Sequence, residues 1–495
     1  MTPTPHSERA RQWVHVGSGS FALLLRVLNW RQAAALALVA LAFNFLVLPR
    51  IGGRRLYRPV DEARGFPLGI LLYPLSVLAL VLLFPTRLDI AAAAWGILAL
   101  GDGAATLVGR ATGSTTINAK AAKIARGNSN LNSTTATGTT IDARTAGYAE
   151  RNLSASSAGS AFGRRSLPWN RDKTWAGSAA FIVFGGAGAV ALALWTRVNV
   201  TPEPSLTFGI VAPLVATVVA AFVESIPVGL DDNISVPATA GLVLWLASLA
   251  SAASFAASRG AIVAALPWAL AVNAVTAWAG YRARSVSRSG AIGGIAVGSV
   301  IYACAGGGAW ALLLVTFLLA SIASRLGLTR KSLLGIAEER GGRRGAGNAI
   351  ANCGVAAAAA VVAATTPHAS AAMLALVTAL TAGGSDTVAS EIGKAWGRST
   401  FLVTTLRRVA PGTPGAMSLE GTAAGVGAAF ALAATGIALG LAPASALVAI
   451  VAGATAGALV ESALAATLEG PGILNNDMLN FINTAVAAAV ALAIA

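Results

Sequence analysis

Two stretches of the chain place an aspartate among small residues at the end of an apolar run. The first, residues 101–110, contains Asp102, and the second, residues 384–394, contains Asp386. In both, six residues separate the aspartate from a glycine, and a cation follows that glycine. Ionisable residues at membrane depth are costly and are functional by default, and carboxylate oxygens are ligands that Mg²⁺ accepts. We therefore predict two related halves, each with one site for a metal ion and phosphate.

Further polar residues recur in the same order behind each aspartate. Residues 170–178 open the next apolar run in the first half, and residues 411–422 do so in the second. Glu224 and Glu461 each stand in a Val-Glu-Ser triplet at the end of a later run. A short polar stretch follows each glutamate, at 230–233 and at 474–477. The shared order of these motifs favours an internal duplication.

These residue types suit phosphoryl transfer, in which a protein mainly positions the reactants and neutralises charge. Asp102 and Asp386 are the predicted Mg²⁺ ligands, and Glu224 or Asp231 is placed to accept the proton of an attacking hydroxyl. Glu461 is the counterpart of Glu224 as a base or second ligand. Cations are predicted to hold phosphate oxygens, and glycines let the backbone approach them closely. The residues predicted on these grounds are Gly101, Gly103, Gly109, Arg110, Lys173 and Lys394, and the polar stretch after Glu461 adds Asn475, Asn476 and Asp477 as cofactor-binding positions.

Simpler structural explanations exist for some of these residues. Asp102 alone is also compatible with a helix cap, although the repeat argues against that explanation. The stretch 475–477 is equally compatible with a polar turn and helix N-cap. The basic link 325–344 is typical of a topology determinant. Alternatively, its last residues face phosphate together with Asn348 and Asn352, which share one helix face.

Composition places the chain among integral membrane proteins. Of 495 residues, 56% are hydrophobic and only 11% are charged, and the mean hydropathy is +0.70. A soluble domain does not have this composition. The formal net charge of +15 resides mostly in short links between apolar runs, which is the positive-inside pattern and excludes a nucleic-acid partner.

Several chemistries are excluded by residue type. Two cysteines in apolar surroundings form neither a disulfide framework nor a metal cluster. His6 and His15 lie in the polar N-terminal tail and His368 in an outer link, which argues against histidine catalysis and zinc ligation. The chain contains no Walker-type phosphate-binding loop.

The apolar runs predict an all-α, polytopic membrane protein with about 14 transmembrane helices in two related repeat halves. We expect a polar N-terminus and interfacial helix at 1–31, a first membrane domain at 32–284 with a polar cytoplasmic insert at 118–165, and a second membrane domain at 285–495. The basic links predict that the acidic motifs face the cytoplasm. We expect the protein to lie in a bacterial inner membrane. The predicted spans are about 32–48, 66–84, 88–108, 175–195, 206–226, 235–257, 260–281, 290–305, 309–325, 346–364, 369–388, 420–440, 444–466 and 478–495.

The motifs of residues 66–257 resemble the phytol kinase and dolichol kinase family. The resemblance rests on Gly-Asp-x-x-Ala-x-x-x-Gly-Arg at 101–110, Lys-Thr-x-x-Gly-Ser at 173–178, and Glu-Ser-x-Pro with Leu-Asp-Asp-Asn at 224–233. It implies a membrane enzyme that phosphorylates isoprenoid alcohols with CTP. It also implies site positions at Ser178, Asp232 and Asn233.

The second half, from about 285, is similar to a related family that contains the phytyl-phosphate kinases, which add the second phosphate. The matching positions are Asn352, the run 386–393, residues 411–415 and residues 418–422. The resemblance implies a catalytic role for Glu391 and cofactor-binding roles for Asn352 and Ser390. Two features depart from the families, because the insert after Arg110 is long and Val388 stands where tryptophan is expected.

These observations predict a two-domain isoprenoid kinase with Mg²⁺ as cofactor and CTP or another nucleoside triphosphate as phosphate donor. The first half would convert a prenyl or phytyl alcohol to the monophosphate, and the second would convert the monophosphate to the diphosphate. The expected partners are the isoprenoid substrate, the nucleotide and membrane lipids. Association of the chain into a homo-oligomer is compatible with the sequence but is not predicted by it. The alternatives are a CTP-dependent lipid cytidylyltransferase and a secondary transporter with internal repeats.

Overall fold

The computed structural model describes residues 8–51, 67–109, 111, 166–170, 172–226, 230–336, 343–471 and 473–495. The chain divides into two compact units, Met1–Ser248 and Leu249–Ala495, and each is described here by itself. This boundary precedes the expected division after residue 284, because the helix Ala252–Arg282 packs against helices of the second unit. The expected insert at 118–165 and the predicted phosphate-binding Arg110 lie outside the described residues.

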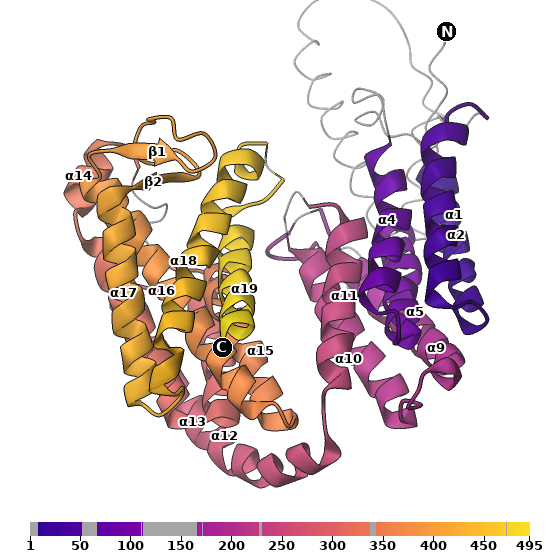
Figure 1. The fold of residues 1–495 in the computed structure, drawn as a ribbon, viewed down its shortest axis with the longest axis horizontal. Coiled ribbons are helices and arrows are strands. Elements are labelled where there is room, and N and C mark those ends of the chain that lie inside the picture. Colours follow the sequence, from indigo (N-terminus) through magenta and orange to yellow (C-terminus); the bar gives the residue numbers. More distant parts are fainter. Residues whose placement is uncertain are drawn as a thin grey trace, which may run out of the picture. The chain divides into compact units, whose positions relative to one another are not determined.

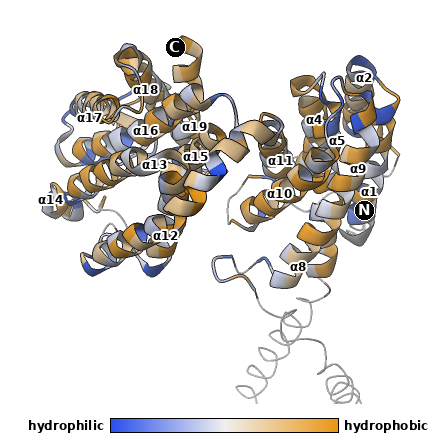
Figure 2. Ribbon diagram, turned by 90° about the horizontal axis from the view of Figure 1, so that it is seen from below, coloured by the Kyte–Doolittle hydropathy of each residue, from blue (hydrophilic) through white to orange (hydrophobic). Residues whose placement is uncertain are grey.

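The all-α membrane architecture is confirmed. Within the described residues, 11 helices are long and apolar enough to cross a membrane. Large apolar side chains lie exposed on their surfaces, including Val263 at 63%, Trp268 at 67% and Trp278 at 65%. Hydrophobic residues cover most helices, and hydrophilic residues gather mainly in the links (Figure 2). Such surfaces suit lipid as the surrounding solvent.

Three structural features account for the difference between 14 expected spans and 11 observed ones. The helix Leu68–Leu83 is a shorter apolar helix, and the helix Asp232–Ser248 (α11) has only 17 residues. The expected spans 290–305 and 309–325 form one 38-residue element that is interrupted at Gly306, where φ is 84°. Only glycine adopts such a backbone angle readily, so this position breaks the helix geometry between the two expected spans.

The first unit is a helical bundle around α5 and its continuation to Gly109 (Figure 1). In the most apolar stretch of this helix, 72% of the residues are buried. Residues Ile90–Ala94 are at most 1% exposed, because alanines allow neighbouring helices to approach from every side. The elements are α1 Glu8–Ser18, η1 Gly19–Arg26, α2 Trp30–Ala42, η2 Phe43–Val47, α4 Leu68–Leu83, α5 Leu88–Gly96, η4 Ile97–Asp102, α8 Trp175–Ala180, η5 Phe181–Gly185, α9 Gly186–Thr196, η6 Arg197–Asn199, α10 Leu206–Ser225 and α11 Asp232–Ser248.

The second unit is organised in the same manner around α16. In the most apolar stretch of this helix, 78% of the residues are buried. Helices α13, α15, α17, α18 and α19 all pack against it (Figure 1). The elements are α12 Ala252–Arg282, α13 Arg288–Arg325, α14 Leu328–Leu333, α15 Ala346–Thr365, α16 Ala369–Trp396, β1 Thr400–Leu402, β2 Ala416–Ser418, α17 Leu419–Ala438, η8 Ala444–Ala446, α18 Leu447–Leu464, η9 Ala465–Glu469 and α19 Asn476–Ile494.

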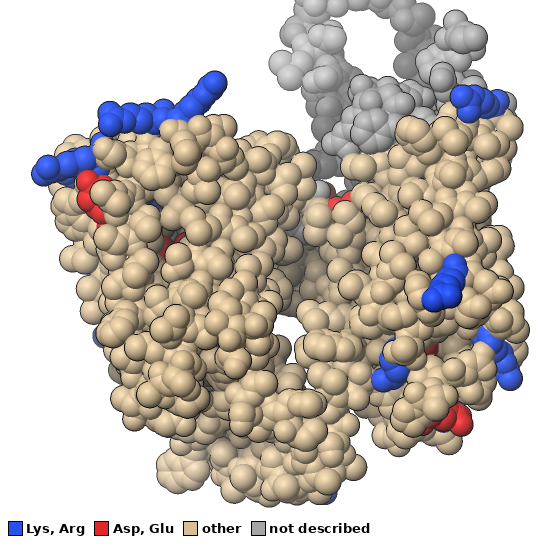
Figure 3. All heavy atoms as spheres, viewed as in Figure 1, with Lys and Arg blue, Asp and Glu red and all other residues tan. Residues whose placement is uncertain are grey.

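A short antiparallel hairpin of β1 and β2 closes one end of the second unit, with Thr400 opposite Ser418. The hydropathy pattern did not predict it, because three-residue strands leave no periodic signal. On the face shown in Figure 3, Lys and Arg side chains gather at the end of the unit where the hairpin and α14 lie, and the visible flank carries little charge. The exposed cations there include Arg398, Arg407 and Arg408.

Candidate functional site

Three carboxylates meet in the first unit. Asp102 comes from the central helix, Glu224 from the end of α10 and Asp232 from the start of α11. One oxygen of each lies within 4.8 Å of the other two, and Asp102 and Glu224 are buried. Because the helix continues from Asp102 to Gly109, Asp102 lies inside a helix, and its interpretation as an N-terminal cap is wrong. Asp102 therefore forms one cluster with two acids that lie more than 120 positions further along the sequence.

Lys173 neutralises part of this negative charge. Its ammonium donates to Glu224 and, over 3.2 Å, to Oδ2 of Asp232. Burial disfavours the charged ammonium, but the carboxylates of Asp232 and Glu224 outweigh burial and raise the pKa of Lys173 above its ordinary value. Lys173 is therefore a permanent cation of the site. The motif predicted such a cation, but as a holder of phosphate and not as a partner of the acids. One lysine balances only one of three carboxylates.

The remaining negative charge and geometry suit a divalent cation. Oε2 of Glu224 is buried and has no hydrogen-bond partner among the described residues. Hard oxygen donors of this kind suit Mg²⁺, which takes one or two carboxylates and keeps its other positions for water and phosphate. Asp102, Glu224 and Asp232 are thus the residues that fit the ion. The motifs predicted Asp102 as the metal ligand in this half and Glu224 as a base or second ligand, whereas Asp232 was expected only as a site position.

The polar cavity around the three acids has a volume of about 490 Å³. Asp231 and Asn233 line it, as predicted, and Asn233 donates to Oδ1 of Asp231 through its backbone amide (3.0 Å) and its side chain (2.7 Å). Asn170 also lines the cavity and is held by a 3.1 Å bond from its side chain to the carbonyl of Ser225. Ser178 does not line it.

The N-terminal helix α1 contributes residues that the sequence analysis missed. His15 lies with Nε2 3.1 Å from the carbonyl oxygen of Leu98 and 3.5 Å from Oδ2 of Asp102. Its side chain is only 11% exposed, so its assignment to a polar tail is wrong. Arg11 and Gln12 also line the cavity. The spacing of these three, on one face of a helix, was the available signal.

Two carboxyl groups meet in the second unit in the corresponding way. Asp386 on α16 and Glu461 on α18 line one cavity and lie close enough to interact electrostatically. Asn483 of α19 donates to Oε2 of Glu461 over 3.1 Å. Two carboxylates this close repel each other unless a proton or a cation lies between them. The polar cavity that contains both acids has a volume of about 250 Å³, and Ser390, Lys394, Asn476 and Asn480 also line it.

Glu391 has a different environment from the one predicted for a catalytic residue. Its Oε2 accepts from the ammonium of Lys331 on α14, and both side chains are 2% exposed. Its Oε1 lies 3.8 Å from Nζ of Lys394. Lys331 also donates to the carbonyl of Ser324 over 2.9 Å. Glu391 lines the cavity, but this buried ion pair fixes α14 against α16.

Three other residues predicted for the second site lie elsewhere among the described residues. Asn475 caps α19, since its Oδ1 accepts from the amide of Met478 over 2.9 Å. Asp477 faces Gly347, where an added Cβ would lie 2.2 Å from Oδ2 of Asp477. Asn352 donates to the carbonyl of Asn348 over 3.0 Å and lines a neighbouring apolar cavity. The N-cap alternative is therefore correct for Asn475.

The spacing between aspartate and glycine that the two halves share has a packing explanation. A Cβ added to Gly177 would lie 3.5 Å from the Cα of Gly109, and one added to Gly421 would lie 3.0 Å from the Cα of Gly393. In each unit the glycine of the motif thus touches the first turn of the next long helix. Gly101 packs on Phe181 and Gly103 on Val16.

The predicted approach of Gly101, Gly103 and Gly109 to phosphate is thus not needed to explain these glycines. Their helices also use the backbone amides internally. A side-chain hydroxyl caps the adjoining helix in both units, since Thr174 accepts from Gly177 and Ser418 accepts from Gly421, each over 3.1 Å. The two units therefore share a glycine contact, a cap and a pair of acids.

Gly421→Ala is expected to lower the free energy of unfolding by about 1–3 kcal/mol, because the new methyl group would stand 2.5 Å from the backbone oxygen of Ala389. Gly427→Ala on the same helix is the matched control, since nothing lies within 4 Å of a Cβ added there. That control should be neutral or stabilising by up to about 1 kcal/mol. Denaturant titration in detergent measures both, and equal effects would contradict the packing explanation.

Comparison with known proteins identifies the family of the second unit. The model of the family described as integral membrane protein DUF92 matches residues 271–488. The uncharacterized membrane protein sll0875 of Synechocystis is 35% identical over 201 residues, which are 40% of this chain and 78% of that protein. The chain belongs to the DUF92 family. The match begins within α12, so Asp386, Glu461 and their cavity all lie in the DUF92 part.

Two further relatives match a similar share of the chain. The uncharacterized membrane protein MJ0933 of Methanocaldococcus jannaschii is 31% identical over 205 residues, 41% of this chain and 84% of that protein. The chloroplastic protein VTE6 of Arabidopsis thaliana is 37% identical over 214 residues, 42% of this chain and 64% of VTE6. No solved structure matches the chain. The resemblance of residues 66–257 to the phytol and dolichol kinases stays a prediction.

Proposed function

We propose that the protein is a membrane isoprenoid kinase with two active units. The first unit would phosphorylate a prenyl or phytyl-type alcohol, and the second would phosphorylate the monophosphate. The observation that supports this most is the meeting of two acids, Asp102 with Glu224 and Asp386 with Glu461, in a polar cavity of each unit. The family membership of the second unit, its similarity to VTE6 and its resemblance to the phytyl-phosphate kinases support the second step.

In the first unit, the alcohol oxygen would form a bond to the γ-phosphorus as the bond from that phosphorus to the β-phosphate oxygen breaks. The nucleoside diphosphate leaves, and the hydroxyl proton passes to a carboxylate. Asp231 suits this task better than Glu224, because Glu224 is paired with the ammonium of Lys173, whereas the carboxylate of Asp231 accepts hydrogen bonds from the backbone amide and side chain of Asn233. A bound Mg²⁺, held by Asp102, Glu224 and Asp232, would neutralise charge on the nucleotide.

The second unit would not need a base of this kind. A prenyl monophosphate is already largely deprotonated near pH 7, since the second pKa of a phosphomonoester is about 6. Asparagines at 475 and 476 accordingly replace the acids at 231 and 232 in the corresponding stretch. Arg344 and Lys394 line the second cavity and would offset the additional phosphate charge. Asp386 and Glu461 would hold Mg²⁺ there.

Each polar cavity adjoins an apolar one, which suits a substrate with a hydrocarbon tail. In the first unit an apolar cavity of about 460 Å³ shares Arg11 and His15 with the acidic cavity. Its wall includes Val77, Val81 and Trp95. The exposed arginines at the hairpin end of the second unit support a cytoplasmic location for that end, by the positive-inside rule.

The test is a product assay with purified full-length protein in detergent. Mg²⁺ is supplied with CTP, ATP or no nucleotide, and with phytol, geranylgeraniol or their monophosphates, and lipid products are identified by mass spectrometry. Diphosphate formation with release of CDP or ADP would support the proposal. Pyrophosphate release with a CDP-lipid would indicate a cytidylyltransferase instead, and substrate uptake into vesicles without nucleotide would indicate a transporter.

Mg²⁺ is expected to stabilise the protein by about 2.7 kcal/mol when present at about 100 times its dissociation constant. Asp232→Asn should weaken this stabilisation, because it removes one of three clustered carboxylates in the first unit. Glu203→Gln is the control. The carboxylate of Glu203 lies 3.1 Å from the guanidinium of Arg197 and is not part of the acidic cluster. Thermal unfolding in a Mg²⁺ titration measures the effect. An unchanged Mg²⁺ response in Asp232→Asn would argue against this metal site.

A further inference from the structure

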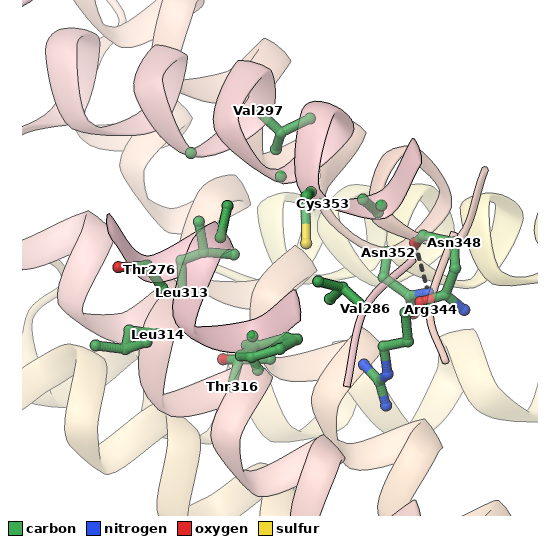
Figure 4. Close-up of a pocket in the computed structure, with 18 of the residues that line it drawn as sticks. Thr276, Val286, Val297, Leu313, Leu314, Thr316, Arg344, Asn348, Asn352 and Cys353 are labelled. Carbon is green, nitrogen blue, oxygen red and sulfur yellow. Dashed lines mark hydrogen bonds between the residues drawn. The ribbon is translucent and has the colours of Figure 1, made fainter. Parts of the chain in front are cut away.

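An apolar cavity of about 130 Å³ lies within the second unit between α12, α13, α15 and α16. Its wall includes Val297, Leu313, Leu314 and Phe317. In Figure 4, Leu313, Leu314 and Thr276 lie toward one side of this cavity, and Arg344, Asn348 and Asn352 lie together toward the other. The cavity therefore has an apolar part and a polar end.

The polar end is also part of the acidic cavity. Arg344 and Asn348 line both the apolar cavity and the cavity that contains Asp386 and Glu461. The two spaces thus adjoin at these two side chains. A ligand that fills both must have a hydrocarbon portion and a polar head, joined at the position of Arg344.

The backbone at Arg344 is held in place by the link between α12 and α13. Its amide donates to the carbonyl of Ser285, and its carbonyl accepts from the amide of Ser287, each over 3.0 Å. The Asn352 side chain donates to the carbonyl of Asn348 on the preceding turn of α15. A guanidinium on a fixed backbone is well suited to bind a phosphate group, because its planar donors match two phosphate oxygens.

We propose that the apolar cavity binds the head-proximal part of a prenyl monophosphate tail, and that Arg344 and Asn348 bind its phosphate beside Asp386. This inference rests on the proposed function and names the substrate position in the second unit. A cavity of this volume encloses only the first part of a long isoprenoid tail, so the rest extends toward lipid. The site therefore distinguishes prenyl phosphates by the presence of the first isoprene units and tolerates longer tails.

Gly294→Leu tests the tail site directly. Gly294 lines the cavity, and nothing lies within 4 Å of a Cβ added there, so a larger apolar side chain can begin at this position without a clash of its Cβ. Gly427→Leu on α17 is the matched control, because it also has open space and does not line the cavity. Dissociation constants are measured for geranylgeranyl monophosphate, dimethylallyl monophosphate and inorganic phosphate, with the full chain in detergent and without nucleotide.

Gly294→Leu is expected to weaken binding of geranylgeranyl monophosphate roughly tenfold or more, since it excludes about two methylene groups from the cavity. Inorganic phosphate should bind to this variant as to wild type, which also shows that the variant is folded. Arg344→Gln should weaken binding of all three ligands. Gly427→Leu should change none of the dissociation constants.

The results separate this inference from the proposed function. If Gly294→Leu binds geranylgeranyl monophosphate as tightly as wild type, the cavity is not the tail site, even where wild type forms diphosphate. If the binding pattern is as expected but no nucleotide yields diphosphate, the tail site stands and the kinase proposal fails. If Gly294→Leu does not fold, Arg344→Gln decides, and loss of inorganic phosphate binding without loss of prenyl phosphate binding would overturn the inference.

Discussion

Asp386→Asn is expected to stop the reaction at the prenyl monophosphate, with a loss of roughly 10²–10³-fold in the second step. The substitution keeps the shape of the side chain but removes its charge, so a cation beside Glu461 loses one of its two clustered carboxylates. Mass spectrometry of products from alcohol, Mg²⁺ and nucleotide measures the effect. Monophosphate should accumulate in place of diphosphate.

Two matched variants make this result specific. Asp477→Asn also removes a carboxylate from the predicted motif, but Asp477 faces Gly347 outside the cavity, so this variant should retain both steps. Asp102→Asn should form no monophosphate from alcohol, yet convert supplied monophosphate to diphosphate. If Asp386→Asn still makes diphosphate from monophosphate, the assignment of the second step to this unit is wrong.

Lys331→Met is expected to lower the free energy of unfolding by about 3–5 kcal/mol. Lys331 and Glu391 are both 2% exposed, and removal of one partner leaves an uncompensated buried charge. Denaturant titration in detergent measures the loss. The double variant Lys331→Met with Glu391→Leu should recover most of it, because no charge then remains buried.

Lys394→Met provides the control for the buried pair. Lys394 approaches the same carboxylate at 3.8 Å, but its side chain is 29% exposed, so its removal should cost at most about 1 kcal/mol. Equal losses in the two single variants would contradict a structural role for Lys331. If the double variant is as stable as wild type but forms no diphosphate, Glu391 takes part in catalysis as the resemblance implied.

The membrane class and the acidic pairs could be predicted from the sequence because they depend on local pattern. Apolar runs of membrane length identify spans wherever they fold, and an aspartate or glutamate within such a run needs a partner. The repeated order of Asp102 and Glu224, then Asp386 and Glu461, therefore indicated which acids to group. Helix counts were less accurate, because a break at Gly306 is invisible to hydropathy.

Only the tertiary structure decided which side chains serve each site. Glu391 and Asp386 stand five positions apart in one motif, yet α16 turns one toward Lys331 and the other toward Glu461. His15 reaches Asp102 from a helix that reads as a polar tail. Helix rotation and the choice of neighbours arise from packing of small residues over distant parts of the chain, so spacing in the sequence specifies candidates for a site and packing selects among them.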